Sequence, residues 1–378
     1  MIRQALAAAA VAFLAAAAPA QSPATFPDAK HGRGELTHVN GVPVLTVRGS
    51  PAEIGEQFGI LAGKNAPGLN QLQAQFVKDA GLEEQLPGIK ILARRLKANM
   101  PADYLTELEA AAKAGGLDLD MLLFGACVYD LSSGMGCATV VVEKARSTTG
   151  QPLFGRNFDW LPSKGIPEHT LVVVYKPTGK HAFATVTISP VTGCISGMND
   201  AGLCCTLNEI PLRRSKDKAG FDWGGVPTMM AFRRVLEECT TVAGAEKCLR
   251  GLRRTTAACM TVCDPNGGAV FEITPKSLEV RSAVNGVTCC TNHFCCEKLC
   301  VGEKCWRLPK LLTLQTEDAK LGPADVFTRL HAVNQGKQTL QAMVFEPAAR
   351  TLHLKLGDGE KPATAREAVV LGLGAMFR

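Results

Sequence analysis

The feature that most constrains the fold is a change of hydrophobic period at residues 132–134. Before this point, apolar residues recur with helical spacing, and in the segment 101–113 Leu105, Leu108 and Ala112 share one face. After it, apolar and polar residues alternate in short runs that are typical of β-strands. Runs of strands with helices in separate blocks favour antiparallel sheets covered by helices over a doubly wound parallel sheet. The sequence therefore predicts an α+β fold with a mainly helical first third.

The individual elements can be placed along the chain. A short hairpin at 36–47 precedes a helix that begins at Ser50-Pro51, with a good N-cap and a proline in its first turn. Further helices are expected at 70–100 (interrupted at 87–88), 101–113, 117–131, 226–250, 304–315 and 323–334. Strands are expected at 138–143, 152–156, 170–176, 182–188, 194–198, 202–207, 258–263, 268–273, 278–283, 287–291, 340–346 and 351–356.

The N-terminus has the pattern of a cleaved secretory signal. Arg3 supplies one positive charge, an apolar run of about 14 residues follows, and small residues end it at 18–20. The run is short for a membrane span, which needs about 20 apolar residues. An alanine-rich disordered tail or an uncleaved anchor is the alternative. We expect cleavage near Ala20, a secreted or periplasmic product, and no membrane span in the remaining chain.

Charge and cysteine content bound the possible partners and the compartment. The net charge of +6 is small for 378 residues, and no Lys/Arg run is long enough to follow a phosphate backbone, so we expect no nucleic-acid partner. Fifteen cysteines in an exported chain indicate disulfide bonds. Because the number is odd, at least one thiol must be free or paired outside the chain. Cys137 is one candidate, but parity alone does not select it.

Gly136-Cys137, at the start of the strand 138–143, is the strongest candidate for chemistry. A cysteine at a chain terminus is a complete catalyst, because its thiol attacks while its own α-amine, with a pKa of about 7.7–8.0, takes and returns the proton. Such a terminus forms if Cys137 attacks the carbonyl of Gly136 and the resulting ester is hydrolysed. Gly136 would permit the strained backbone that this attack requires. Taken alone, the pair more commonly marks a buried or disulfide-bonded cysteine.

Several separate stretches, in order from about residue 45 to 310, share a pattern with one family. They are Gly49 to Gly55 with Gly59, Gly136-Cys137, Gly155 to Trp160, Gly197 to Asn199 with Gly202, Leu203 and Asn208, Thr291 to Phe294, and Arg307. The chain thereby resembles the N-terminal-nucleophile hydrolases of the penicillin acyltransferase type, which are related to acid ceramidase and choloylglycine hydrolase. The first stretch resembles the propeptide signature of that family, and the second resembles its processing site.

The resemblance implies an architecture and a reaction. The fold would be a four-layer αββα sandwich, with a signal peptide (1–20), a mainly helical prosegment (21–136) and a catalytic fragment (137–378). The chain would cut itself between Gly136 and Cys137, and its fragments would stay associated. Cys137 would attack a linear amide in a small molecule, of the N-acyl amine or N-acyl amino acid type. Water or an amine would then take the acyl group from the thioester. No metal or organic cofactor would be needed.

Three of the implied site residues form the nucleophilic centre. Cys137 would be the nucleophile and, through its free amine, the general base. Asp159 would orient that amine, and the charge of Arg156 would favour the thiolate. An ordinary ion pair at a strand end is the structural alternative for Arg156 and Asp159.

Three further residues would stabilise charge during the reaction. Asn208 and Asn292 would offer side-chain N–H groups to the oxyanion or to the scissile group, and Arg307 would complete the electrostatic frame. The alternatives are two asparagines that cap strands and an arginine that is solvated. Ala138 departs from the family, which commonly has a hydroxyl residue directly after the cysteine.

Three rival interpretations use the same segments differently. In a papain-like arrangement, Cys137 would remain within an intact chain and use His293 with Asn292. A metal cluster could be drawn from Cys289, Cys290, Cys295, Cys296, Cys300 and Cys305, although these lack the paired C-x-x-C spacing of zinc sites. A disulfide-rich binding protein that has kept the fold without turnover is the non-enzymatic alternative.

Overall fold

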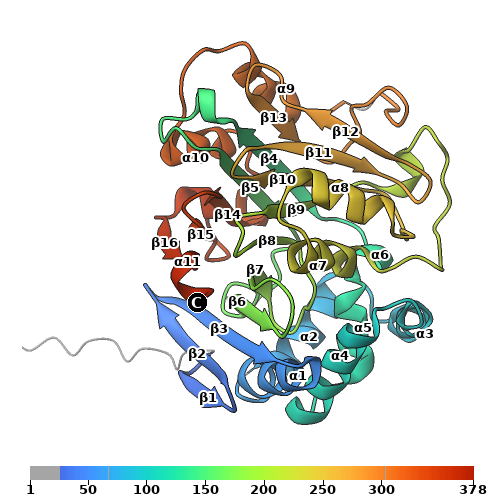
Figure 1. Cartoon of the computed structure of the whole chain (residues 1–378). Coiled ribbons are helices and arrows are strands. Elements are labelled where there is room, and N and C mark those ends of the chain that lie inside the picture. Colours follow the sequence, from blue (N-terminus) through green and yellow to red (C-terminus); the bar gives the residue numbers. More distant parts are fainter. Residues whose placement is uncertain (1–25, 67, 303) are drawn as a thin grey trace, which may run out of the picture.

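The computed structural model describes residues 26–66, 68–302 and 304–378, so the predicted signal peptide lies outside the described residues. Two β-sheets stack face to face, and helices cover their outer faces (Figure 1). The α+β class and the four-layer arrangement expected from the sequence are both confirmed.

The larger sheet has ten strands in the order β1-β2-β3-β6-β7-β8-β9-β10-β11-β12. Its strands are β1 (Ala29–His31), β2 (Gly34–Val39), β3 (Val42–Gly49), β6 (Thr170–Pro177), β7 (Phe183–Ile188), β8 (Ser196–Asn199), β9 (Cys204–Glu209), β10 (Ala258–Asp264), β11 (Gly267–Ile273) and β12 (Leu278–Ser282). Neighbouring strands are antiparallel, with the exception of β3 and β6, which are parallel.

The smaller sheet has six strands in the order β13-β4-β5-β14-β15-β16, and all of its neighbours are antiparallel. Its strands are β13 (Val287–Cys290), β4 (Gly136–Val142), β5 (Leu153–Asp159), β14 (Thr339–Glu346), β15 (Thr351–Leu356) and β16 (Val369–Gly372). The strand that opens with Gly136-Cys137 therefore lies inside the sheet, between β13 and β5.

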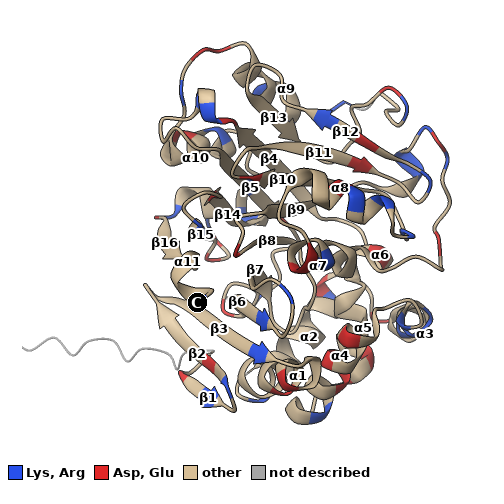
Figure 2. Ribbon diagram, in the orientation of Figure 1, with Lys and Arg blue, Asp and Glu red and all other residues tan. Residues whose placement is uncertain are grey.

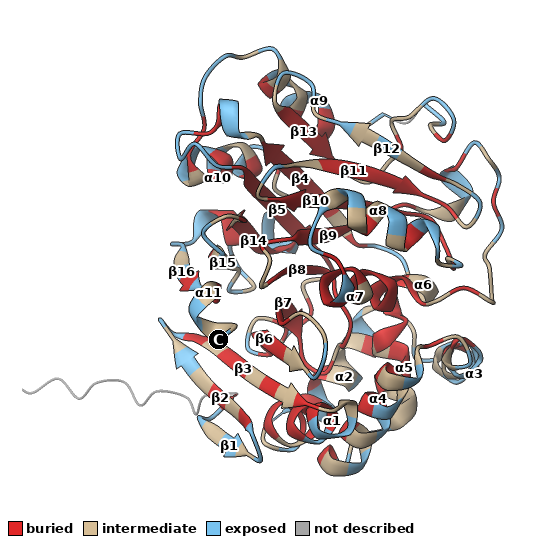
Figure 3. Cartoon of the chain, viewed as in Figure 1, coloured by how far each residue is buried: buried red, intermediate tan, exposed pale blue. Residues whose placement is uncertain are grey.

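Apolar clusters define the layers. One cluster joins the outer face of the ten-stranded sheet to the first eight helices, a second fills the space between the sheets, and a third joins the six-stranded sheet to α9 and α10. The helices are α1 (Pro51–Phe58), α2 (Leu69–Asp79), α3 (Leu86–Lys97), α4 (Ala102–Gly115), α5 (Leu119–Ala126), α6 (Val128–Leu131), α7 (Thr228–Glu238), α8 (Val242–Arg250), α9 (Arg307–Leu312), α10 (Pro323–His331) and α11 (Leu373–Met376). The central strands are buried along most of their length (Figure 3).

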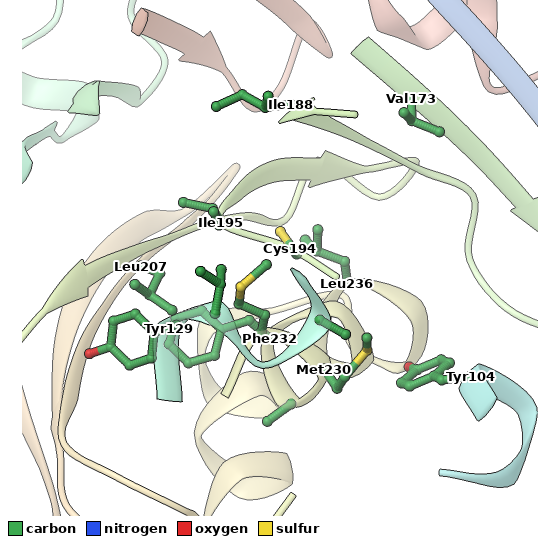
Figure 4. Close-up of a cluster of buried hydrophobic side chains, with 14 of the residues drawn as sticks. Tyr104, Tyr129, Val173, Ile188, Cys194, Ile195, Leu207, Met230, Phe232 and Leu236 are labelled. Carbon is green, nitrogen blue, oxygen red and sulfur yellow. The ribbon is translucent and has the colours of Figure 1, made fainter. Parts of the chain in front are cut away.

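Helix α7 shows how the core sets the orientation of the strand next to the site. Met230, Phe232 and Leu236 of this helix lie in one cluster with Leu207 of β9 (Figure 4). Full burial of side chains of this kind stabilises the fold by about 1.5–3 kcal/mol each. Because successive side chains of a strand point to opposite faces, Asn208 is turned away from α7 and toward the six-stranded sheet.

The predicted prosegment does more than form helices. Strand β3 pairs in parallel with β6, from Val44 opposite Val172 to Gly49 opposite Pro177. Residues 29–49 thus supply three strands of the larger sheet, and their departure would leave β6 as an open edge.

Two glycines of the propeptide-like stretch have a packing reason. A Cβ atom at Gly55 would lie 2.1 Å from the backbone oxygen of Glu107, and one at Gly59 would lie 2.3 Å from that of Ala111. Helix α1 can therefore contact α4 backbone to backbone only with glycine at both positions. The predicted start of α1 is confirmed, since Ser50 forms a capping box with Glu53.

Two helix predictions were wrong in their extent. The segment 70–100 is interrupted between Asp79 and Leu86 and not at 87–88, because Pro87 lies in the first turn of α3. The segment 226–250 is two helices, because the chain leaves the helical conformation at Cys239 and Thr241 begins α8 as a new N-cap. The Thr241 hydroxyl accepts the backbone N–H of Gly244 at 3.0 Å. Among the described residues, no helix combines the length and apolarity that crossing a bilayer requires.

Candidate active site

Cys137 is the second residue of β4, and its thiol is buried against the larger sheet. Its Sγ–H donates to the carbonyl oxygen of Leu207 on β9 at 3.3 Å. Arg156 on β5 donates from Nη2 to the sulfur at 3.4 Å and from Nη1 to the same Leu207 oxygen at 2.6 Å. The pairing of β4 with β5 sets Thr139 opposite Arg156, which brings the guanidinium onto the face of Cys137. The expected contact between Cys137 and Arg156 is present.

The two groups have opposing electrostatic effects. Burial raises the pKa of the Cys137 thiol, and the charge of Arg156 counters part of that rise. Arg156 is itself completely buried, and its guanidinium lies 5.3 Å from the centre of the Phe158 ring. In the intact chain the Cys137 thiol is thus buried, and it lies beside a cation that favours its ionised form.

Asp159 lies beside the peptide bond that precedes Cys137. The residue is opposite Gly136 in the pairing of β4 with β5. Its carboxylate accepts hydrogen bonds from Thr339 Oγ1 at 2.5 Å and Gln335 Nε2 at 2.7 Å, and it lies 3.5 Å from Arg307 Nη1. These three partners fix the carboxylate next to the proposed cleavage point.

The structure gives a different reason for glycine at position 136 than the one expected. Gly136 is not among the residues with positive φ, so the intact chain needs no left-handed backbone there. A Cβ atom at this position would instead lie 2.1 Å from Gln335 Nε2 and 3.0 Å from Asp159 Cβ. A side chain at position 136 would therefore displace the end of Gln335, which holds Asp159, and would crowd Asp159 itself.

Asn292 and Arg307 complete the group around Cys137. Asn292 Oδ1 accepts the backbone N–H of Cys137 at 2.8 Å and an N–H of Arg307 at 2.8 Å. Arg307 Nη1 donates to the backbone oxygen of Cys137 at 2.7 Å. The solvated-arginine alternative is therefore wrong, since Arg307 is only 8% exposed at the start of α9.

Asn208 is adjacent to this group but does not touch Cys137. Its Nδ2 donates to the backbone oxygen of Thr291 at 3.1 Å, which links β9 to the loop that carries Asn292. Its buried Oδ1 has no hydrogen-bond partner among the described residues. The Nδ2 group of Asn208 has a second N–H, which makes no recorded hydrogen bond with the described residues and can be offered to a substrate.

Sequence reasoning missed Glu209. Its carboxylate accepts the backbone N–H of Met135 at 2.7 Å and that of Gly134 at 3.1 Å, so it anchors the two residues before Gly136. Burial raises the pKa of Glu209, although both hydrogen bonds favour the charged form. Its place directly after Asn208 in the third family-like stretch was the available signal. Gln335 lay outside every motif and gave no such signal.

His293 does not take the place that a papain-like arrangement would require. Its Nδ1 lies 3.1 Å from Thr291 Oγ1, and hydrogen bonds with Cys295 and Cys305 raise its pKa to about 10. Burial alone would raise the pKa of Cys305, but the bond with His293 lowers it to about 6. The imidazole is thus engaged with other thiols, while the recorded side-chain partners of Cys137 are Leu207 and Arg156.

All fifteen cysteines are unbonded in this structure, and Cys194 and Cys205 have sulfurs 4.0 Å apart. No cluster of three or more His, Cys, Asp or Glu side chains within the described ranges could hold a metal ion. The described residues therefore give the metal-cluster alternative no support.

Two cavities share Trp160 as a lining residue. A polar cavity of about 340 Å³ opens beside the peptide bond between Gly136 and Cys137. It is lined by residues 133–136, Asp159, Trp160, Glu209, Pro211, Arg213, Arg214, Asn292, Arg307, Gln335 and Gln338. A smaller, apolar cavity of about 60 Å³ is lined by Leu72, Gln73, Phe76, Met121, Phe124, Gly125, Val128, Trp160, Ile166, Ile188, Ser189, Pro190 and Val191. Together they can hold a molecule with one polar and one apolar end.

Comparison with known proteins shows that part of the chain is similar to one protein family. Residues 146–305 match the family model described as acyl-coenzyme A:6-aminopenicillanic acid acyl-transferase. The resemblance to the penicillin acyltransferase family is confirmed. This segment includes Arg156, Asp159, Asn208 and Asn292, whereas Cys137 and Arg307 lie just outside it.

Other likenesses are more distant. An uncharacterized protein of Archaeoglobus fulgidus is 24% identical over 288 residues, which cover 67% of this chain and 47% of that protein. The chain thus spans about half the length of this curated relative. Among solved structures, an N-acylethanolamine-hydrolyzing acid amidase ortholog of Caenorhabditis elegans matches at 18% identity and a TM-score of 0.43, covering 56% of this chain and 93% of its own. A conjugated bile acid hydrolase variant of Clostridium perfringens matches at 14% identity and a TM-score of 0.44, and the match covers 62% of this chain and 97% of that protein.

Proposed function

We propose that the chain is an exported precursor that cuts itself between Gly136 and Cys137 and then hydrolyses a linear amide through Cys137. The observation that carries this proposal is the set of groups around one peptide bond. The Cys137 thiol, the Arg156 cation and the hydrogen bonds of Asn292 and Arg307 all converge there, beside an open polar cavity.

Self-cleavage would begin with the thiol and the bond before it. The Cys137 sulfur bonds to the carbonyl carbon of Gly136 as its proton leaves, the C–N bond to Cys137 breaks as that nitrogen takes up the proton, and water hydrolyses the resulting thioester. Glu209 holds Gly134 and Met135 in place during this step, and Asn292 Oδ1 holds the nitrogen that becomes the new amine. The product carries a free α-amine at Cys137, next to its own thiol.

Amide hydrolysis would then use the new terminus. The α-amine takes the thiol proton, the sulfur forms a bond to the substrate carbonyl carbon, and the proton passes to the departing amine as the C–N bond breaks. Water then cleaves the thioester and releases the acid. We assign the oxyanion to the Nδ2 groups of Asn292 and Asn208. Asn292 would exchange its bond to the backbone oxygen of Glu209 for it, and Asn208 would use its second N–H.

The apolar cavity beyond Trp160 suits the acyl part of the substrate. Leu72, Phe76 and Phe124 come from the prosegment, whereas Ile188 and Val191 come from the catalytic fragment. An acyl group bound there would touch both fragments. We therefore propose that the prosegment stays in the active enzyme and forms part of its binding site.

Export would also allow the cysteines to form disulfide bonds. The thiols of Cys194 and Cys205 are buried neighbours whose sulfurs lie 4.0 Å apart, and an oxidising compartment favours a bond between such a pair. We propose that they form one of the disulfides that the cysteine content indicates.

A trapped acyl-enzyme tests the proposed reaction. Processed protein would be mixed with an N-acyl amide, quenched in acid within the first turnover and measured by mass spectrometry. We expect the acyl mass on the fragment that begins at Cys137, and no such mass after thiol alkylation. Turnover that survives alkylation of Cys137 would contradict the mechanism. His293→Ala should retain most activity, whereas a papain-like enzyme would lose it.

A further inference from the structure

Arg213 is a cation in the polar cavity with no assigned role. It lies on the short turn after β9, four residues from Glu209, and lines the same cavity as Asp159 and Asn292. Its side chain is exposed and forms no recorded hydrogen bond or ion pair with any residue that the structure describes. By contrast, the guanidinium of Arg307 is already bound to Cys137 and Asn292.

Three of the other charged groups that line the cavity are already engaged, so Arg213 is the cation that is available to a ligand. Arg307 lies 3.5 Å from Asp159, and the Glu209 carboxylate accepts the backbone N–H groups of Gly134 and Met135. The charge of Asp159 is thus balanced by Arg307, and burial raises the pKa of Glu209. The α-amine released by self-cleavage would add a further positive charge when protonated.

The two cavities have linings of different polarity on either side of a shared residue. Trp160 borders both, with apolar side chains such as Leu72 and Phe76 on one side and Arg213 on the other. An arginine fork binds a carboxylate through two parallel N–H···O bonds, and this geometry discriminates carboxylates from neutral groups. The site therefore fits a molecule with an apolar acyl group at one end and an anion at the other.

We propose that the amine released by the reaction carries a carboxylate that Arg213 binds, so that the preferred substrates are N-acyl amino acids. This inference rests on the proposed function, and it selects one substrate class within it. Neutral alkanolamides and simple amides of the same acyl group lack the anion and would be cleaved less efficiently.

A matched pair of substrates tests the inference. N-decanoylglycine and N-decanoylglycinamide differ only in the charged carboxylate, and kcat/KM would be measured for both with processed enzyme. We expect a preference of about tenfold for the acid, which corresponds to one charge-assisted hydrogen-bonded contact. The preference should fall as salt is raised, because the arginine is exposed.

Variants assign the preference to one residue. Arg213→Gln should remove the preference by lowering kcat/KM for the acid alone, and Arg213→Lys should retain part of it. Arg250→Gln is the matched control, because Arg250 is an exposed arginine paired with Glu246 on α8, away from the cavity. Equal kcat/KM for both substrates in the wild type would overturn the inference, as would an undiminished preference in Arg213→Gln.

Failure of the proposed function would look different. Equilibrium binding of both compounds to the wild type would be measured by calorimetry alongside turnover. Tighter binding of the acid that depends on Arg213, without any hydrolysis, would support the carboxylate site and overturn the hydrolase. Hydrolysis of both compounds at equal rates, with equal binding, would support the hydrolase and overturn the carboxylate site.

Discussion

Arg156 tests the electrostatics of the nucleophile at the scale of a single residue. Burial raises the pKa of the Cys137 thiol, and attack requires the thiolate, so the rate of self-cleavage should rise with pH. Arg156→Gln removes the cation that favours the thiolate and should move this rise to higher pH. Processing at neutral pH should slow by about tenfold or more, because one pKa unit is one factor of ten in thiolate.

The pH profile separates this role from misfolding. Rates would be followed by the appearance of the two fragments on denaturing gels between pH 6 and 10. Arg156→Lys, which retains the charge, should show a smaller displacement than Arg156→Gln. An unchanged profile in Arg156→Gln would show that the guanidinium does not act on the thiol.

Gly136 tests the geometry of the cleaved bond. In Gly136→Ala, the new Cβ would meet Gln335 Nε2, which is 2.1 Å from its ideal position. We expect processing to slow strongly in this variant and to recover in part when Gln335→Ala is added. The rate of fragment formation measures both effects. Gly88→Ala is a control, because nothing lies within 4 Å of its added Cβ. Normal processing of Gly136→Ala alone would contradict the steric explanation.

At the scale of elements, a buried ion network joins the prosegment to the catalytic fragment. Arg233 on α7 binds both carboxylate oxygens of Glu107 on α4 at 2.7 Å and lies 2.8 Å from Glu237. Burial alone would lower the pKa of Arg233, but the two carboxylates raise it. Figure 2 shows acidic residues on α4 and both signs of charge on α7. This network crosses from one predicted fragment to the other.

Arg233→Met should therefore be severely destabilising. It leaves Glu107 and Glu237 buried without their cation, which costs about 3–5 kcal/mol when a buried pair is broken. Arg234→Met is the matched control on the same helix, since its pair with Glu238 is largely exposed and worth about 0.3–0.5 kcal/mol. Urea unfolding would measure both values. A loss of less than 1 kcal/mol in Arg233→Met would contradict the account of this network.

Local sequence signals account for most of the elements but not for all of their partners. The change from helical spacing to short apolar runs bounded by turn residues located the central strands, and strands such as β7 and β9 are buried on both faces. The parallel pairing of β3 with β6 has no local signal, since it joins segments more than 120 residues apart. The edge strands β1 and β16 are short and only partly buried, so their periodicity was too weak to detect.

The candidate site was predictable to a similar degree. Family-like motifs located Cys137, Arg156, Asp159, Asn292 and Arg307, and the structure brings these five together. Gln335 and Thr339 could not be found, because they reach Asp159 across some 180 residues of chain. The steric need for Gly136 depends on the same long-range contacts.

At the scale of the whole molecule, the two predicted fragments are interlocked. The prosegment supplies strands β1 to β3, the Glu107 side of the ion network and one wall of the apolar cavity. Its removal would expose a sheet edge and leave Arg233 without one of its carboxylates. We expect both fragments to co-elute in one complex under native conditions after cleavage.

The measurement that tests the central claim most directly is intact mass under reducing and denaturing conditions. The wild type and Cys137→Ala would both be expressed with export and compared. We predict two fragments that meet between Gly136 and Cys137 in the wild type, and one uncut chain in Cys137→Ala. A wild type that remains whole under every condition, or a Cys137→Ala chain that is cut at the same bond, would contradict the self-processing account.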